Sequence, residues 1–207
     1  MKTLILYATR HGQTRKVAEY LGAALRSRAI EADVVDIAAV GGTLALPGYA
    51  AAVLAAPVHI GKHKDMVPFV RRHRSALETL PCAFVSVSGS QATAEHPGTP
   101  ADARARAVAG VQKSLDDFFR QTGWRPAHVL PVAGALLFSK YNFLVRFVVR
   151  AIVRRAGAPI DLHVDREYTD WAALDRFADA LAVSLRAPPP AERTPPAALG
   201  EARGTAP

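Results

Sequence analysis

Cysteine is almost missing from this chain of 207 residues, which contains Cys82 alone. A single cysteine excludes an internal disulfide framework and any cysteine-rich metal or iron–sulfur site, and it suits a reducing cytoplasm. Long apolar runs are missing as well, since none approaches the roughly 20 residues that cross a membrane. The run from Thr3 to Ala8 is too short for a signal peptide, because it leads directly into Arg10 and His11. We therefore expect a cytoplasmic protein.

Acidic residues are scarce, because 18 Asp and Glu face 26 Lys and Arg, which leaves a net charge of +8. The charges after Ala187 cancel, so the excess lies in the folded body. Such a surface favours an anionic partner: nucleic acid, a lipid surface or an acidic small molecule. The chain lacks the interleaved exposed aromatics that stack bases, so we do not expect nucleic acid.

The length and a hydrophobic content of 50% suit one sizeable α/β domain, which we expect over residues 1–186. Six prolines and little apolar content predict a disordered tail over residues 187–207. Apolar runs alternate with amphipathic stretches, which predicts a parallel sheet with right-handed crossovers. The expected strands are 3–8, 32–37, 51–56, 82–87 and 128–134, and the expected helices are 13–29, 65–80, 99–121 and 170–186.

Two helix starts and one connection carry more specific expectations. Asp65 is expected to cap the second long helix, with Pro68 in its first turn. Thr99 and Pro100 are expected to open the third. The connection over residues 38–49 is interrupted by Gly and Pro, so it holds at most a short helical turn.

The first strand leads into a loop with hydroxyl groups and a glycine, and then into a helix. Backbone N–H groups and the positive end of a helix dipole attract phosphate at such a point. No glycine triplet and no Gly-Lys-Ser/Thr ending is present, so the sequence disfavours a nicotinamide dinucleotide and a nucleoside triphosphate. An ordinary turn with a threonine cap is the alternative. The candidate phosphate-binding residues are Thr9, Arg10, His11, Gly12, Gln13 and Thr14.

This region resembles the phosphate-loop signature of the flavodoxin family. The signature positions are met by Ile5, Leu6, Tyr7, Thr9, Gly12, Thr14, Ala18 and Leu21. The resemblance implies a flavodoxin-like, doubly wound five-stranded parallel sheet with strand order 2-1-3-4-5 and flavin mononucleotide (FMN) as cofactor.

Ligands of such sheets lie at the carboxyl ends of the strands, near the point where the strand order reverses. The flavodoxin resemblance implies that two further loops at this edge flank the isoalloxazine ring of the flavin. Neither loop has the Trp or Tyr that many flavodoxins stack on the ring, so His59 and Ile60 both remain candidates for that place. The loops are Pro57, Val58, His59, Ile60 and Gly61, and Ser88, Gly89, Ser90 and Gln91.

An insertion over about residues 137–167 precedes the last helix and exceeds what a minimal fold needs. Helical spacing over Tyr141–Arg155 places arginines on one stripe and aliphatic side chains on a broad opposite arc. This basic amphipathic helix could lie in a membrane interface, or it could pack on its own domain with a solvated basic edge. The candidate substrate or membrane contacts are Lys140, Phe143, Arg146, Phe147, Arg150 and Arg154.

From Met1 to Arg186 the chain also resembles the menaquinone-dependent protoporphyrinogen IX dehydrogenases of bacterial haem synthesis. The resemblance is carried by residues 1–14, 57–64, 123–126, 132–136, 141–155 and 168–171. It departs from the family at His11, where an acidic residue can occur, and over residues 91–100.

This second resemblance implies FMN-dependent oxidation of protoporphyrinogen IX to protoporphyrin IX, with menaquinone or ubiquinone as the final acceptor. Lys140, Arg146 or Arg150 would pair with the two propionates of the substrate. The same helix would hold the protein as a peripheral protein on the anionic inner face of the cell membrane. A homo-oligomer is compatible with the sequence.

Flavin chemistry needs neither a nucleophile nor a metal, so no catalytic residue is assigned with certainty. His59 and His63 are candidates for handling pyrrole protons, and solvated surface histidines are the alternative. Gly61 and Lys62 between them, and the lack of a third ligand, argue against a metal site. Two other functions stay open: a flavin-dependent NAD(P)H:quinone reductase and a flavodoxin-type electron carrier, of which the basic charge disfavours the carrier.

Overall fold

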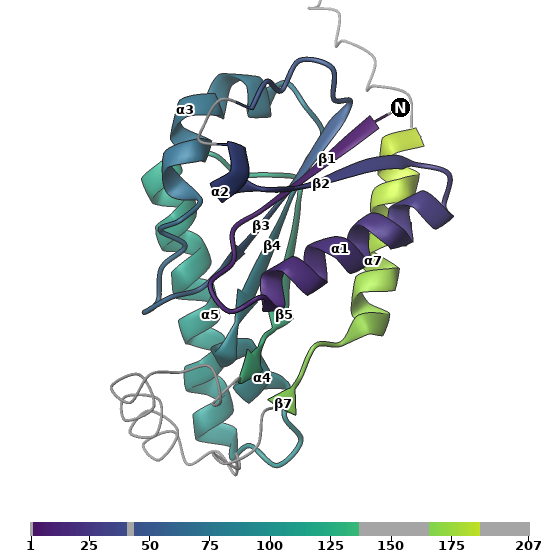
Figure 1. Ribbon diagram of the computed structural model, residues 1–207. Coiled ribbons are helices and arrows are strands. Elements are labelled where there is room, and N and C mark those ends of the chain that lie inside the picture. The colour runs from purple at the N-terminus through teal and green to yellow at the C-terminus, as the bar shows by residue number, and fades with distance from the viewer. Residues whose placement is uncertain (1, 41–43, 137–165, 187–207) are drawn as a thin grey trace, which may run out of the picture.

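A five-stranded parallel sheet forms the centre of the molecule in a computed structural model that describes residues 2–40, 44–136 and 166–186 (Figure 1). Its order is β2-β1-β3-β4-β5, which confirms the predicted topology. Leu6 of β1 lies opposite Val35 of β2 and Leu54 of β3. The strands are β1 (Lys2–Tyr7), β2 (Glu31–Asp36), β3 (Ala51–Pro57), β4 (Cys82–Ser88) and β5 (His128–Ala133).

Helices cover both faces of the sheet (Figure 1). One face carries α1 (Gln13–Ser27) and α7 (Trp171–Arg186), and the other carries α3 (Val67–Glu78) and α5 (Ala101–Thr122). The four long helices that the sequence predicts are therefore confirmed, with ends that differ by a few residues. The short α2 (Ile37–Val40) is the helical turn expected after the second strand.

Apolar side chains of the central strands fill two cores, one on each face. Ile5 of β1 belongs to the core under α1 and α7, whereas Leu4 and Leu6 belong to the core under α3 and α5. All three are fully buried, since successive strand residues point to opposite faces and both faces are covered. Cys82 is buried, as its apolar neighbours predict.

The start of α3 differs from the prediction. Met66, not Asp65, occupies the position before the helix, and no side chain caps it. Asp65 instead accepts two hydrogen bonds from Arg10, at 2.9 and 2.7 Å. A bidentate pair with a guanidinium is stronger than a bond to a backbone N–H, so the expected cap is wrong. Pro68 does lie in the first turn of the helix, as predicted.

Three elements were not anticipated from the sequence. The segment after β4 is a helix, α4 (Gly89–Glu95), rather than a loop. Two short strands, β6 (Ala135–Leu136) and β7 (Arg166–Glu167), pair antiparallel on either side of the insertion. This pairing brings residues 135–136 beside residues 166–167, at the two ends of the insertion.

Several predictions fall on residues outside the described part of the chain. They are the helix over Tyr141–Arg155 with its contacts Lys140, Phe143, Arg146, Phe147, Arg150 and Arg154, and the tail over residues 187–207. Within the ranges that the structure does describe, no helix combines the length and the apolarity needed to cross a membrane.

Candidate functional site

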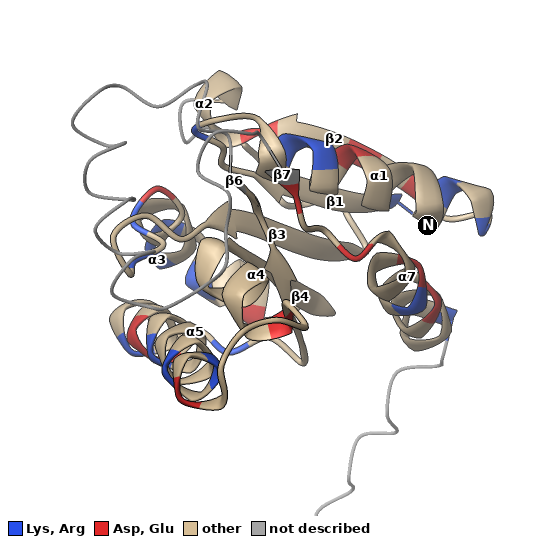
Figure 2. Ribbon diagram, turned by 90° about the horizontal axis from the view of Figure 1, so that it is seen from below, with Lys and Arg blue, Asp and Glu red and all other residues tan. Residues whose placement is uncertain are grey.

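The three predicted loops meet at the carboxyl edge of the sheet, the side seen in Figure 2. Hydrogen bonds between neighbouring strand ends hold them there. The N–H of Ala8 donates to Ala55 at 2.9 Å, and that of Val58 donates to Val87 at 2.8 Å. The N–H of Gly134 donates to Ser88 at 2.9 Å, which adds the end of β5 to the same edge.

The loop after β1 leaves the start of α1 open to an anion. Gly12 precedes the helix with φ of 90°, a left-handed conformation that glycine adopts without strain, and it offers no capping side chain. Thr9 Oγ1 accepts a hydrogen bond from Gly12 N at 3.0 Å, which closes the loop on itself. Because no side chain caps the first turn, its backbone N–H groups keep their capacity to bind a phosphate.

Arg10 links this loop to the loop before α3. Its guanidinium forms an ion pair with Asp65, and each side chain is about one-third exposed, at 34% and 32%. The positive charge of Arg10 is therefore balanced within the protein. An anion in the loop would depend mainly on backbone N–H groups and hydroxyls, with His11 exposed at the rim.

Gln13 and Thr14, the first two residues of α1, are buried. The side chain of Gln13 donates to Glu167 and Thr169, which follow the insertion in the chain. The carboxamide of Gln13 is thus hydrogen-bonded inside the protein. Only the backbone N–H of Gln13 is then available to bind a phosphate. No local pattern in the sequence indicates this contact across about 150 residues.

The second loop ends in a tight turn with an unusual backbone. His59 and Lys62 exchange two hydrogen bonds, at 2.9 and 3.2 Å, around a turn formed by Ile60 and Gly61. Both central residues have positive φ, 49° and 69°. A β-branched residue in this conformation costs about 1–2 kcal/mol. Ile60 is nevertheless 86% exposed, so the turn presents an aliphatic side chain at the rim of the site.

His59 is half-buried at the base of this turn. Burial lowers the pKa of His59, and the positive charges of Arg10 and Lys64 lower it further. The imidazole is therefore neutral near pH 7 and able both to donate and to accept a hydrogen bond. It remains a candidate for contact with a ligand at this edge.

His63 lies inside the protein, which corrects the expectation of a solvated histidine. Its side chain is 2% exposed, and its ring packs against Phe84 and Phe118. Burial lowers the pKa of His63 to about 4. Nε2 lies 3.2 Å from Ser86 Oγ, and the buried Nδ1 has no hydrogen-bond partner with good geometry. A neutral ring enclosed in this way cannot exchange protons with a substrate at the surface, so it supports the loop from below.

The third segment is the first turn of α4. Ser88 caps the helix, because its Oγ accepts a hydrogen bond from Gln91 N at 3.0 Å. The side chain of Gln91 donates to Glu95. Gly89 and Ser90 between them are exposed at the site edge. The predicted residues therefore lie at the start of a helix, and the hydroxyl of Ser88 is already used to cap it.

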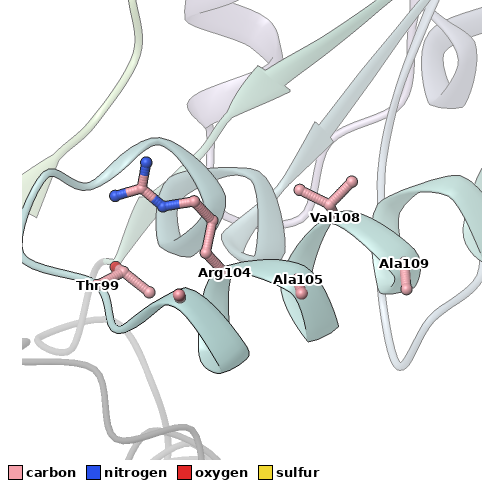
Figure 3. A pocket seen from close by; sticks show the side chains of 6 residues that line it. Thr99, Arg104, Ala105, Val108 and Ala109 are labelled. Carbon is pink, nitrogen blue, oxygen red and sulfur yellow. The ribbon is translucent and has the colours of Figure 1, made fainter.

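Two further features of the described residues concern metal binding and cavities. Within the part of the chain that the structure describes, no three His, Cys, Asp or Glu residues are grouped so as to hold a metal ion. An open hollow of about 650 Å³ lies on the outer side of α5, and among the residues that the structure describes no predicted site residue lines it (Figure 3). It is lined by Thr99, Ala101, Arg104, Ala105, Val108 and Ala109.

Known proteins resemble this chain over most of its length. A family model described as Flavodoxin domain matches residues 4–162. The chain is 32% identical to a protein of Escherichia coli (strain K12) named protoporphyrinogen IX dehydrogenase (quinone), over 88% of this chain and 95% of that protein. A Leishmania major protein of the same name is 31% identical over 91% of this chain and 78% of its own length.

One solved structure agrees at the level of fold alone. The rubredoxin oxygen:oxidoreductase of Desulfovibrio gigas aligns with a TM-score of 0.50 and 14% identity, over 89% of this chain and 36% of that one.

Proposed function

This chain belongs to the flavodoxin domain family, and from that premise we propose that it is an FMN-dependent oxidoreductase of haem biosynthesis. It oxidises protoporphyrinogen IX to protoporphyrin IX and delivers the electrons to a membrane quinone, menaquinone or ubiquinone. The observation that carries the proposal is the convergence of an open phosphate loop and two flanking segments at one edge of the sheet. The names of the relatives from Escherichia coli and Leishmania major support the choice of substrate and acceptor.

The residues at this edge fit FMN. The loop from Thr9 to Thr14 would hold the phosphate through N–H groups of the uncapped first turn and through hydroxyls. The segments 57–61 and 88–91 would lie on either side of the ring. When bound, FMN supplies the two-electron chemistry by taking hydrogen from the substrate and returning electrons to the quinone.

The protein's own part is to orient the reactants and to exclude water. Ile60, whose aliphatic side chain is exposed at the rim of the site, would cover the ring in place of the Trp or Tyr that many flavodoxins stack on it. The neutral imidazole of His59 stands beside it and can hold or accept a proton from the pyrrole nitrogens of the substrate. We propose no such role for His63, which is buried beneath the loop.

Substrate and membrane binding are assigned to the insertion, on sequence grounds. Lys140, Arg146 and Arg150 would pair with the two propionates, while Phe143 and Phe147 would contact the apolar macrocycle. Arg146, Arg150 and Arg154 would also face anionic head groups and keep the protein on the inner face of the cell membrane.

The membrane part of the proposal has a direct test. Replacing Arg146, Arg150 and Arg154 by Glu should release the protein from anionic liposomes, because each substitution turns attraction into repulsion. Replacing them by Lys keeps the charge and serves as the control. Equal co-sedimentation of the Glu variant and the wild type would refute the anchoring.

The redox part is tested with the purified protein. We expect a yellow protein that takes up FMN and gains porphyrin fluorescence when it is mixed anaerobically with protoporphyrinogen IX and a menaquinone analogue. A yellow protein without that gain in fluorescence would refute protoporphyrinogen IX as the substrate but would support FMN as the cofactor. Rapid reduction by NADPH in a stopped-flow instrument would instead favour a NAD(P)H:quinone reductase. A protein that stays colourless with added FMN would overturn the proposed function as a whole.

A further inference from the structure

Two segments that lie far apart in the chain meet beside the phosphate loop in four residues, which we call the Gln13 cluster: Gln13, Lys16, Glu167 and Thr169. Gln13 Nε2 donates to Thr169 Oγ1 at 2.9 Å and to Glu167 Oε1 at 3.1 Å. Thr169 Oγ1 in turn donates to the carbonyl of Ala133, at the end of β5, at 2.8 Å. Gln13 and Thr169 are only 7% and 9% exposed. Figure 2 shows β7 beside the first turns of α1.

The cluster does for α1 what a capping side chain does for other helices. A cap holds the first turn, but it also occupies an N–H group that a phosphate would use. Here Gly12 provides no cap, and the first turn is held from outside by the side chain of Gln13. The helix start is therefore held while its N–H groups remain available.

The cluster also balances the negative charge of Glu167 near the phosphate loop. A carboxylate beside a helix start would repel a bound phosphate. Glu167 forms an ion pair with Lys16 at 3.2 Å and accepts a hydrogen bond from Gln13. Both contacts hold its carboxylate among positive and donor groups of α1. Its charge is thereby balanced locally.

We propose that Gln13 and Thr169 are positioning residues for the phosphate of the flavin. They set the first turn of α1, so that its N–H groups point at the phosphate before the cofactor arrives. β6 and β7 pair at the two ends of the insertion, so the same contacts tie the phosphate loop to the base of the insertion. Binding at the loop and order at that base are then reciprocally linked. The inference rests on the proposed function, since it needs FMN in this loop.

The test compares two flavins and two substitutions at one residue. Thr169→Val keeps the shape of the side chain but removes the acceptor for Gln13 and the donor to Ala133. Thr169→Ser keeps the hydroxyl and is the matched control. Riboflavin lacks the phosphate, so its binding does not use the first turn of α1. We expect Thr169→Val to raise the Kd for FMN about tenfold and to leave the Kd for riboflavin unchanged, with Thr169→Ser within about twofold of the wild type for both.

Hydrogen exchange provides a second readout at the base of the insertion. FMN should slow exchange in the peptide that contains residues 166–170 in the wild type, and it should not do so in Thr169→Val. Should Thr169→Val fail to fold, Gln13→Met removes the same donor at similar side-chain length and is measured in the same way.

The outcomes separate this inference from the proposed function. Equal weakening of FMN and riboflavin would indicate general damage and would overturn the positioning role, and so would unchanged affinity for both. In either case a wild type that binds FMN leaves the proposed cofactor standing. A wild type that takes up neither flavin would overturn both.

Discussion

The burial of His63 leads to a specific prediction about acid stability. Its ring lies 5.1 Å from that of Phe84 and 5.3 Å from that of Phe118, centroid to centroid, and its Nε2 is 3.2 Å from Ser86 Oγ. Burial lowers the pKa of His63 from 6.5 to about 4, against a smaller opposing effect of the backbone at Ala56 and Pro57. In acid, the unfolded chain therefore binds a proton at this residue before the folded protein does.

The sign and size of the effect follow from proton linkage. Where the unfolded chain binds more protons, the free energy of unfolding falls as the pH falls. That condition holds from about pH 6.5 down to about pH 4. Over this whole pH interval the free energy of unfolding falls by about 3 kcal/mol. About 2 kcal/mol of this should be lost between pH 7 and about pH 5. At the lower pH most unfolded chains carry a proton on His63, whereas most folded molecules do not.

Urea unfolding at these two pH values measures the effect. We expect His63→Phe, which keeps an aromatic ring beside Phe84 and Phe118, to lose about 2 kcal/mol less than the wild type on acidification. Ser86→Ala is the control, since it removes a contact but keeps the titrating ring, and it should show the wild-type loss. Aspartates with lowered pKa values, such as Asp33 and Asp117, stay ionised in both states over this range and cancel. Parallel losses in the wild type and His63→Phe would refute the argument.

Three further substitutions test the site rim and the core. Ile60→Asn should raise the free energy of unfolding of the apoprotein by about 1 kcal/mol, because Asn tolerates the left-handed backbone, and should weaken FMN binding; a thermal melt and a flavin titration check this, with Ile60→Val as the control. Gly123→Ala should cost about 1–2 kcal/mol in urea unfolding, since Gly123 ends α5 with φ of 67° and a Cβ would lie 2.7 Å from Arg74 Nη1; an unchanged midpoint would contradict this. Trp124→Ala should cost about 3–5 kcal/mol, because the side chain is 1% exposed beside Phe84 and Phe118; a loss below about 1 kcal/mol would show that the core closes around the gap.

The parallel sheet and the strand, loop and helix at the start of the chain could be predicted because their signals are local. The loop from Thr9 to Thr14 lies between a strand and a helix that are adjacent in the chain, and its hydroxyl groups and glycine make it a candidate phosphate site. The alternation of strands and helices predicts a parallel sheet, because right-handed crossovers leave few other arrangements. The order of the strands came from the resemblance to flavodoxins and agrees with the structure.

The remaining features depend on contacts between distant residues. Asp65 has the sequence context of a helix cap, but Arg10 binds it from 55 positions earlier. From the sequence, His59 and His63 are equal candidates for handling protons in the same loop. Packing leaves His59 half-exposed and encloses His63 between aromatic rings.

By itself, the sequence determined the alternation of strands and helices in this protein and the strand, loop and helix at its start, because periodicity and loop composition act over a few residues. Tertiary structure alone decided what holds that helix start in place. Gln13 and Thr169 are 156 positions apart, and a hydrogen bond across that distance exists only once β5, α1 and the strand after the insertion have packed at one edge of the sheet. Burial and pairing of polar groups are properties of the assembled surfaces, so no local pattern carries them.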